Sequence, residues 1–313
     1  MLPLNFSNLN RRLLWTSRHL ERLKVCITNF DIEFLLYDSS AIMAPIWSES
    51  LADVSKRGHE AEVLVKILLE VLTISVRALS MRELKLISKF YLDLEHLPAE
   101  IFNHDRVFTV ASSLLAFSFP KQNLGPMDCH VKLVHPALRD FLVLHRDEND
   151  EAQFYRVWET NANHDLATFC LLTLMDCPEA RIPDREFIAS KPFLEYSAKY
   201  WHIHFKRSGI GGPLNLVTKL FMSPACFTSW LAIYDPDGNP AERGIKREHA
   251  SPLYYASLLG LHSVAKALLD RGARLDEGGG KHGEPFMAAL SSGHEDVMKL
   301  FVDSSVVYGG QFV

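Results

Sequence analysis

The chain has 313 residues, 48% of them hydrophobic and 23% charged, with a formal net charge of −5 at pH 7. This composition excludes general disorder, because the chain carries enough apolar surface to fill one or more cores. The acidic balance and the lack of a long basic block argue against nucleic acid or an anionic membrane as a partner. The length predicts two or three domains.

Five cysteines are present, an odd number with no Cys-x-x-Cys pair. We interpret them as reduced thiols of an intracellular protein and predict no metal site. The N-terminus has no signal-peptide pattern, and the most apolar segment, residues 63–76, is interrupted by Lys66 and Glu70 and is too short to span a bilayer. We therefore expect a cytoplasmic protein.

Residues 1–60 carry the weakest pattern. Alternation within residues 24–37 allows one or two strands, and residues 39–55 are expected to form a loop followed by a short helix. The segment at residues 16–19, followed by Val25 and Ile27, resembles the strand-end Ser-Arg motif of NACHT-type nucleotide-binding proteins. The segment is an uncertain remnant, for which the end of a NACHT domain is one interpretation.

Residues 61–148 predict a winged-helix-like module. An apolar helical stripe occupies residues 63–71, and Ser80 with Glu83 forms a capping box that predicts a helix from Met81. Residues 107–119 are expected to hold a helix end and a strand, residues 129–134 alternate as a strand, and Pro136 opens a helix through residue 144. This order of helices and strands is that of a winged-helix module.

Residues 149–245 are expected to form a helical linker. Its predicted core residues over residues 214–233 are Leu216, Leu220, Phe221, Phe227, Trp230 and Leu231. A Gly- and Pro-containing loop at residues 235–249 is expected to separate this linker from the C-terminal part.

Residues 246–313 repeat themselves. Pro252 and Pro285 lie 33 positions apart, as do three other pairs: Ala256 and Ala289, Gly260 and Gly293, and Val264 and Val297. This is the ankyrin period, so the spacing predicts two helix pairs. A first helix is expected to begin at Pro252, and a second to run from residue 263 to 269.

The end of the repeated stretch departs from the pattern. Glu284 stands where the first copy has the capping Ser251, and Ser305 stands where the first copy has Gly272. Two helix pairs cannot bury a continuous core alone, so the two predicted pairs must pack on the preceding helices or belong to a longer array of repeats.

These segments resemble a known family. Residues 251–254 and 270–275 match ankyrin signatures, and residues 77–84 and 134–142 resemble the winged-helix part of fungal NACHT–ankyrin proteins, which are signalling NTPases related to NOD-like receptors. Residues 163–167, 170–174 and 193–204 resemble the helices that link these parts. The resemblance covers most of residues 61–302, and implies that His135 is a relic of a nucleotide sensor. The alternative for His135 is a hydrogen-bonding residue at the start of the Pro136 helix.

Nothing in the sequence predicts catalysis or a cofactor. The only glycine-rich candidate for a phosphate loop, residues 278–282, lacks the Ser or Thr hydroxyl of a Walker A motif. His202 and His204 lie two positions apart on a helix and so point to different faces, which favours packing over zinc binding. An unrelated hydrolase or metal protein is the third hypothesis.

We thus predict a mostly α-helical, non-enzymatic protein that binds a protein partner through ankyrin repeats. The competing hypothesis is the regulatory part of a nucleotide-operated STAND switch whose NTPase core is missing or supplied by another chain. The candidate partner-binding residues are aromatic and basic positions of the expected hairpins and first helices: Tyr254, Tyr255, Arg271, Arg274, Lys281 and His282. Tyr254 is equally compatible with core packing, and the others with solvated charge.

Overall fold

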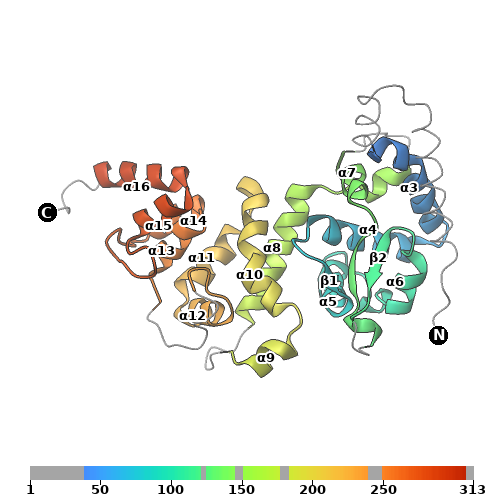
Figure 1. The fold of residues 1–313 in the computed structure, drawn as a ribbon, viewed down its shortest axis with the longest axis horizontal. Helices are drawn as coiled ribbons and strands as arrows, with labels where there is room; N and C mark the ends of the chain where they lie inside the picture. Colours follow the sequence, from blue (N-terminus) through green and yellow to red (C-terminus); the bar gives the residue numbers. More distant parts are fainter. Residues whose placement is uncertain (1–38, 121–124, 145–150, 177–182, 239–248, 308–313) are drawn as a thin grey trace. The chain divides into compact units, whose positions relative to one another are not determined.

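The computed structural model describes residues 39–120, 125–144, 151–176, 183–238 and 249–307 (Figure 1). These residues form fourteen α-helices and one three-stranded sheet, so the prediction of a mostly α-helical chain is confirmed. The chain divides into two compact units, Met1–Ala162 and Asn163–Val313. The expected strands at residues 24–37 and the Ser-Arg segment lie outside the described residues.

Five helices and a small sheet make up the described part of the first unit. The helices are α3 (Ser39–Ser55), α4 (His59–Ile74), α5 (Met81–Leu94), α6 (His104–Val110) and α7 (Pro136–Leu144). Short 3-10 turns follow at Ala99–Ile101, Pro126–Asp128 and Glu151–Tyr155.

Helix α3 occupies all of residues 39–55, where the prediction was a loop followed by a short helix. It is 17 residues long and keeps Pro45 in its interior. Trp47, Leu51 and Val54 recur at helical spacing and are buried, and the Trp47 ring lies 5.5 Å from that of Phe141 on α7. Burial of this stripe therefore outweighs the cost of an internal proline.

The sheet is antiparallel with strand order β1-β3-β2. Its strands are β1 (Leu79–Ser80), β2 (Leu115–Ser118) and β3 (His130–Leu133). Val131 in the central strand pairs with Leu79 on one side and Phe117 on the other. The expected strands near residues 107–119 and 129–134 are confirmed, whereas the two-residue β1 has no counterpart in the sequence analysis.

The predicted capping box at the start of α5 is present. The Ser80 hydroxyl accepts a hydrogen bond from the Glu83 backbone N–H at 3.2 Å, and the Glu83 carboxylate accepts from the Ser80 N–H at 2.7 Å. Arg77 donates two hydrogen bonds to the same buried carboxylate, at 2.6 and 3.0 Å. The turn that carries β1 into α5 is thus fixed by charge-assisted bonds.

The second unit begins within α8 and continues through four more helices to residue 233. These are α8 (Glu159–Met175), α9 (Arg185–Ser190), α10 (Leu194–Arg207), α11 (Leu214–Met222) and α12 (Pro224–Ile233). Helices α11 and α12 meet at 93°, because Ser223 caps a new helix that has Pro224 as its first residue. Among the described residues no single helix is long and apolar enough to cross a bilayer; only this bent pair passes that test jointly, on length and composition.

Two helix pairs close the chain. They are α13 (Pro252–Leu258) with α14 (His262–Leu269), and α15 (Pro285–Ser292) with α16 (Glu295–Val307). The expected helix starts at the two prolines are confirmed, and Ser251 caps the first by accepting from the Tyr254 N–H at 3.2 Å. Helix α16 runs to Val307 instead of stopping where α14 stops, since no glycine follows it in the equivalent place.

The second pair is interlocked with the first at Gly260. This residue has φ +64°, and a Cβ placed on it would lie 2.5 Å from Nδ1 of His294. The His294 ring in turn donates from Nε2 to the Leu258 carbonyl at 3.1 Å. Glycine is therefore required at position 260 both by its backbone conformation and by the neighbouring ring.

An aromatic cluster joins the helix pairs to the preceding helices. Tyr255 of α13 lies 5.7 Å from Phe227 and 6.0 Å from Trp230, both on α12. Trp230 also lies 5.5 Å from Trp201 of α10, and its indole N–H donates to the Ala198 carbonyl at 2.9 Å. Helices α10 to α13 therefore share one core, which supplies the apolar neighbour that two helix pairs need.

Candidate functional site

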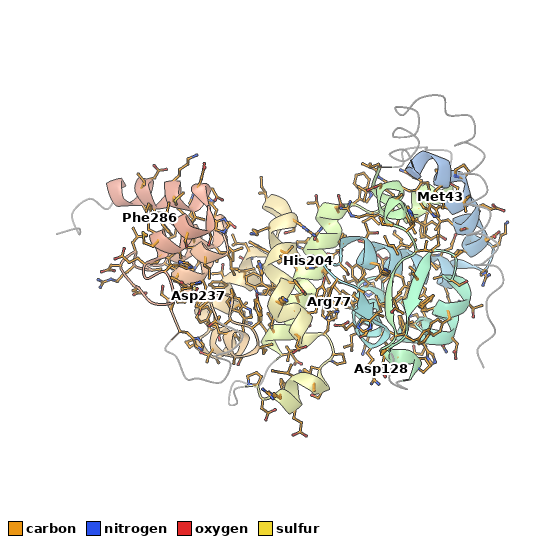
Figure 2. All side chains as sticks on the ribbon, in the orientation of Figure 1. Met43, Arg77, Asp128, His204, Asp237 and Phe286 are labelled. Atoms are coloured by element: carbon orange, nitrogen blue, oxygen red, sulfur yellow. The ribbon has the colours of Figure 1, made fainter. Side chains whose placement is uncertain are left out.

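A polar clamp lies between the end of α12 and the loop that precedes α15. We use this name for Asp235, Asp237, Tyr254 and Tyr255 with the bonds that they make (Figure 2, Asp237). The Tyr254 hydroxyl donates to Asp237 at 2.9 Å, and the Tyr255 hydroxyl donates to Asp235 at 3.0 Å. The Lys281 backbone N–H also donates to Asp237, at 2.5 Å.

Both clamp tyrosines are held in the protonated, donating form. Burial is the main cause that raises the pKa of Tyr254 to about 12, and its bond to Asp237 adds to the effect. Burial also raises the pKa of Tyr255, followed by the charge of Asp235. Neither phenol therefore ionises near neutral pH, and the clamp is a permanent set of hydrogen bonds.

The glycines before Lys281 serve this clamp by their small size. Gly279 has φ +138°, and a Cβ there would lie 2.8 Å from the Ala250 Cα. Gly280 has φ +65°, and a Cβ there would lie 2.5 Å from the Tyr254 ring. The run of glycines lets the loop close over Tyr254. This close packing explains why glycines stand here, so a phosphate-binding role is not needed to explain them.

A hollow of about 730 Å³ lies within the second unit, beside α13. Its large apolar lining residues come from α11 to α14: Phe221, Met222, Phe227, Leu253 and Leu268. Behind these walls, Phe221 and Phe227 contact Trp230, with ring centroids 5.6 and 5.8 Å away. The walls are thus supported by the buried aromatic cluster.

Charged and polar side chains also line the hollow. They belong to Arg271, Glu277, His249 and Thr228. Arg271 is exposed and follows α14, where its Nη1 donates to the Ala267 carbonyl at 2.7 Å. An arginine has five donors, so this bond leaves others for a ligand.

A second polar group is buried in the helices before the hollow. His204 of α10 lies between Asn163 and Tyr196, 2.8 Å from the Asn163 oxygen and 2.9 Å from the Tyr196 hydroxyl (Figure 2). A carboxamide oxygen only accepts, so Nδ1 of His204 carries the proton and Nε2 accepts from Tyr196. Burial lowers the pKa of His204 to about 3, which keeps the ring neutral.

This buried trio contains no Ser, Thr or Cys nucleophile and gives no access to a substrate. His204 and Tyr196 are both 0% exposed. The neighbouring His202 likewise has its pKa lowered by burial, to about 4. No group of three or more metal-binding side chains occurs in the described ranges. We interpret the trio as a polar tie between α8 and α10.

His135 lies at the start of α7 in the first unit. Its Nδ1 accepts a hydrogen bond from the Ala137 backbone N–H at 3.2 Å, and the residue is partly buried. This is the arrangement expected for a histidine that caps the Pro136 helix.

The six predicted partner-binding residues separate into three places. Tyr254 and Tyr255 are buried in the clamp, and Lys281 and His282 lie beside it through their backbone N–H groups. Arg271 borders the hollow. Arg274 is exposed and forms a two-bond pair with Asp276, at 2.9 and 2.6 Å. The tyrosine rings are therefore covered in this structure, while Arg271, Arg274 and Lys281 are exposed.

Asp235 and Asp237 belong to the stretch predicted only as a Gly- and Pro-containing loop. Local sequence gives them no role, because their partners lie 17 to 44 positions away in the chain. Two aspartates flanking a proline, ahead of a pair of adjacent tyrosines, were the available signal.

Comparison with known proteins gives one distant relative. The chain is 26% identical over 259 residues to the "Azaphilone pigments biosynthesis cluster protein L" of Monascus ruber, an alignment that covers 75% of this chain and 54% of the relative. The chain thus spans about half the length of the relative that it matches. No protein-family model matches the chain, and no solved structure matches it.

This relative corrects the predicted family. The expected membership of the NACHT–ankyrin class, with the signalling function and the STAND alternative drawn from it, is wrong, because the match is to a biosynthetic cluster protein and no family model supports that class. The relic nucleotide-sensor role of His135 depended on that family and is withdrawn with it. Capping boxes, Pro helix starts and small residues at helix contacts are physical requirements that unrelated chains share.

Proposed function

We propose that this chain has a metabolic role, as a non-enzymatic component in the biosynthesis of a pigment or a chemically similar small molecule. The observation that carries the proposal is the match to the Monascus ruber protein, whose name places that relative in a pigment biosynthesis cluster. The match extends over 75% of this chain, so it concerns more than one element of the fold.

Binding, rather than catalysis, is the mode of action that the geometry favours. The two buried polar groups described above are paired internally: the clamp aspartates with the tyrosines, and His204 with Asn163 and Tyr196. The hollow is instead lined mainly by apolar side chains, which suit recognition of a ligand better than proton transfer.

The proposal includes a finer description of the fold. The order α4, β1, α5, α6, β2, β3, with β3 central in the sheet, supports a winged-helix-like arrangement in the first unit. The matching starts of α13 and α15 support a tandem of two-helix units at the end of the second. The domain boundaries predicted at residues 60, 148 and 245 stay predictions.

A protein partner is a second candidate for what the chain binds. Four side chains on α15 and α16 are apolar and exposed, namely Phe286, Met287, Leu290 and Val302 (Figure 2, Phe286). Phe286 and Leu290 lie four positions apart on α15 and so share one face of the helix. Apolar side chains that share an exposed face mark contact sites more often than isolated ones do. The net charge of −5 favours a protein over nucleic acid or an anionic membrane.

Deletion of the gene in its own organism tests the metabolic role. We expect the extracted metabolites, separated by liquid chromatography and followed by absorbance and mass, to lose one product or to accumulate its precursor. Reintroduction of the wild-type gene should restore the profile. An unchanged metabolite profile under conditions in which neighbouring biosynthetic genes are expressed would contradict the proposal.

A further inference from the structure

We infer that the hollow between α11–α12 and α13–α14 is a binding site for a flat, largely apolar organic molecule that carries one anionic group. The inference rests on the proposed function, because it names the class of ligand that a pigment-related role requires. Its volume of about 730 Å³ lies within the range of small-molecule sites, roughly 300 to 1,000 Å³.

The walls have the chemistry of an apolar, aromatic ligand. Phe221 and Phe227 present rings to the hollow, and Leu253 and Leu268 complete its floor. All four side chains are at most 7% exposed, so they are already packed before a ligand arrives. A preformed wall loses little conformational entropy on binding, which favours affinity.

The flat shape of the ligand follows from the proposed role in pigment biosynthesis. A pigment absorbs visible light because it contains an extended conjugated system, and such a system is flat and weakly polar. Flat conjugated rings bind well against aromatic side chains in offset or edge-to-face contacts. Phe227 is suited to this role, since its far side is held against Trp230 and Tyr255.

The anionic group follows from Arg271. This side chain borders the hollow, and its one hydrogen bond is to the Ala267 carbonyl. In the described part of the chain it has no ion pair within 4.0 Å, although Glu277 lines the same hollow. Arg274, by contrast, is engaged by Asp276. Arg271 is therefore the guanidinium available to a carboxylate, sulfonate or enolate of the ligand.

Two dyes with one ring system test both halves of the inference. 1-Anilinonaphthalene-8-sulfonate carries apolar aromatic rings and a single sulfonate, and N-phenyl-1-naphthylamine has the same rings without the sulfonate. We expect the full chain to bind each dye with a stoichiometry of about one, measured by fluorescence titration and calorimetry. Ala273→Trp, which fills the hollow from its edge, should weaken both dyes at least tenfold.

Arg271→Gln should separate the dyes. Loss of a charge-assisted hydrogen bond predicts about tenfold weaker binding of the sulfonate dye, whereas binding of the neutral dye should change less than twofold. Arg274→Gln is the matched control, because it removes an exposed arginine outside the hollow, and both dyes should bind as to the wild type. Equal losses for both dyes in Arg271→Gln would refute the assigned anion contact.

Phe286→Ser tests whether the dyes bind the exposed apolar face of α15 instead of the hollow. If this change on α15 abolishes dye binding while Ala273→Trp leaves it intact, the dyes bind the exposed face and the inference is wrong. Circular dichroism and thermal unfolding should verify that each variant is folded. If Ala273→Trp does not fold, Met222→Lys at the exposed rim takes its place, with the same expected loss.

The outcomes distinguish this inference from the proposed function. A changed metabolite profile on gene deletion, without dye binding in the hollow, would overturn the site and leave the metabolic role standing. Dye binding as expected, with an unchanged metabolite profile, would leave the site standing and overturn the role.

Discussion

Acidification should destabilise the second unit through His204. The pKa of this ring is lowered by burial to about 3 in the folded protein, from an ordinary value of 6.5. Below pH 6.5 the unfolded chain therefore binds a proton that the folded chain does not bind, so the free energy of unfolding falls as the pH falls. The contribution of the neutral His204 ring to the free energy of unfolding is complete above pH 6.5 and is lost progressively as the pH falls to 3.

The size of the effect follows from the two pKa values. Between pH 7 and pH 5 the linkage amounts to about 2 kcal/mol, and it reaches about 5 kcal/mol below pH 3. His204 is 0% exposed, so solvent screening does not reduce this value. His202 adds a loss of the same sign, because its pKa is lowered to about 4.

His204→Gln isolates the contribution of one ring. The glutamine amide can donate to Asn163 and accept from Tyr196, and it does not titrate. The free energy of unfolding, measured with urea, should fall between pH 7 and pH 5 in both proteins. We expect this fall to be about 2 kcal/mol smaller in the variant than in the wild type. His262→Gln, at an exposed position on α14, serves as the control and should keep the wild-type difference. The reasoning fails if His204→Gln loses as much stability as the wild type over this interval.

Three further changes test the local structure. Ser80→Ala removes the cap of α5 and should lower the free energy of unfolding by about 1 kcal/mol in urea titrations, whereas an unchanged midpoint would contradict the cap. Gly280→Ala should cost more than Gly283→Ala, since both have positive φ but only the former meets the Tyr254 ring, at 2.5 Å; equal thermal midpoints would refute that contact. In a variant that keeps Cys170 as its only cysteine, a thiol reagent should react at pH 8 only as the protein unfolds, because burial raises the pKa of this thiol to about 12; rapid labelling of the folded protein would contradict its burial.

Features set by neighbouring residues could be predicted from the sequence. The starts of α5, α7 and α13 were predicted because a capping hydroxyl or a proline acts within one turn. The long α3 was not, since its stability comes from burial of Trp47 against α7, which local propensity around Pro45 does not contain.

The candidate sites depend on contacts far apart in the chain. The two-residue β1 exists only through its pairing with β3, about fifty positions later. The hollow needs side chains from α11, α12, α13 and α14 together. The sequence predicts Arg271 as a binding residue and Phe221 and Phe227 as core residues, but it does not show that the three line one hollow. Helix caps and apolar periodicity predict where a helix or strand lies in the sequence, but they do not predict which faces of distant elements pack against each other.

The contact between Gly260 and His294 makes the two C-terminal helix pairs depend on each other. The His294 ring lies where a Cβ at position 260 would stand, and it donates to the Leu258 carbonyl, so each pair supplies part of the other's fit. A substitution at position 260 therefore acts on a residue that is 34 positions later in the chain, and the two pairs tolerate change at this point only jointly.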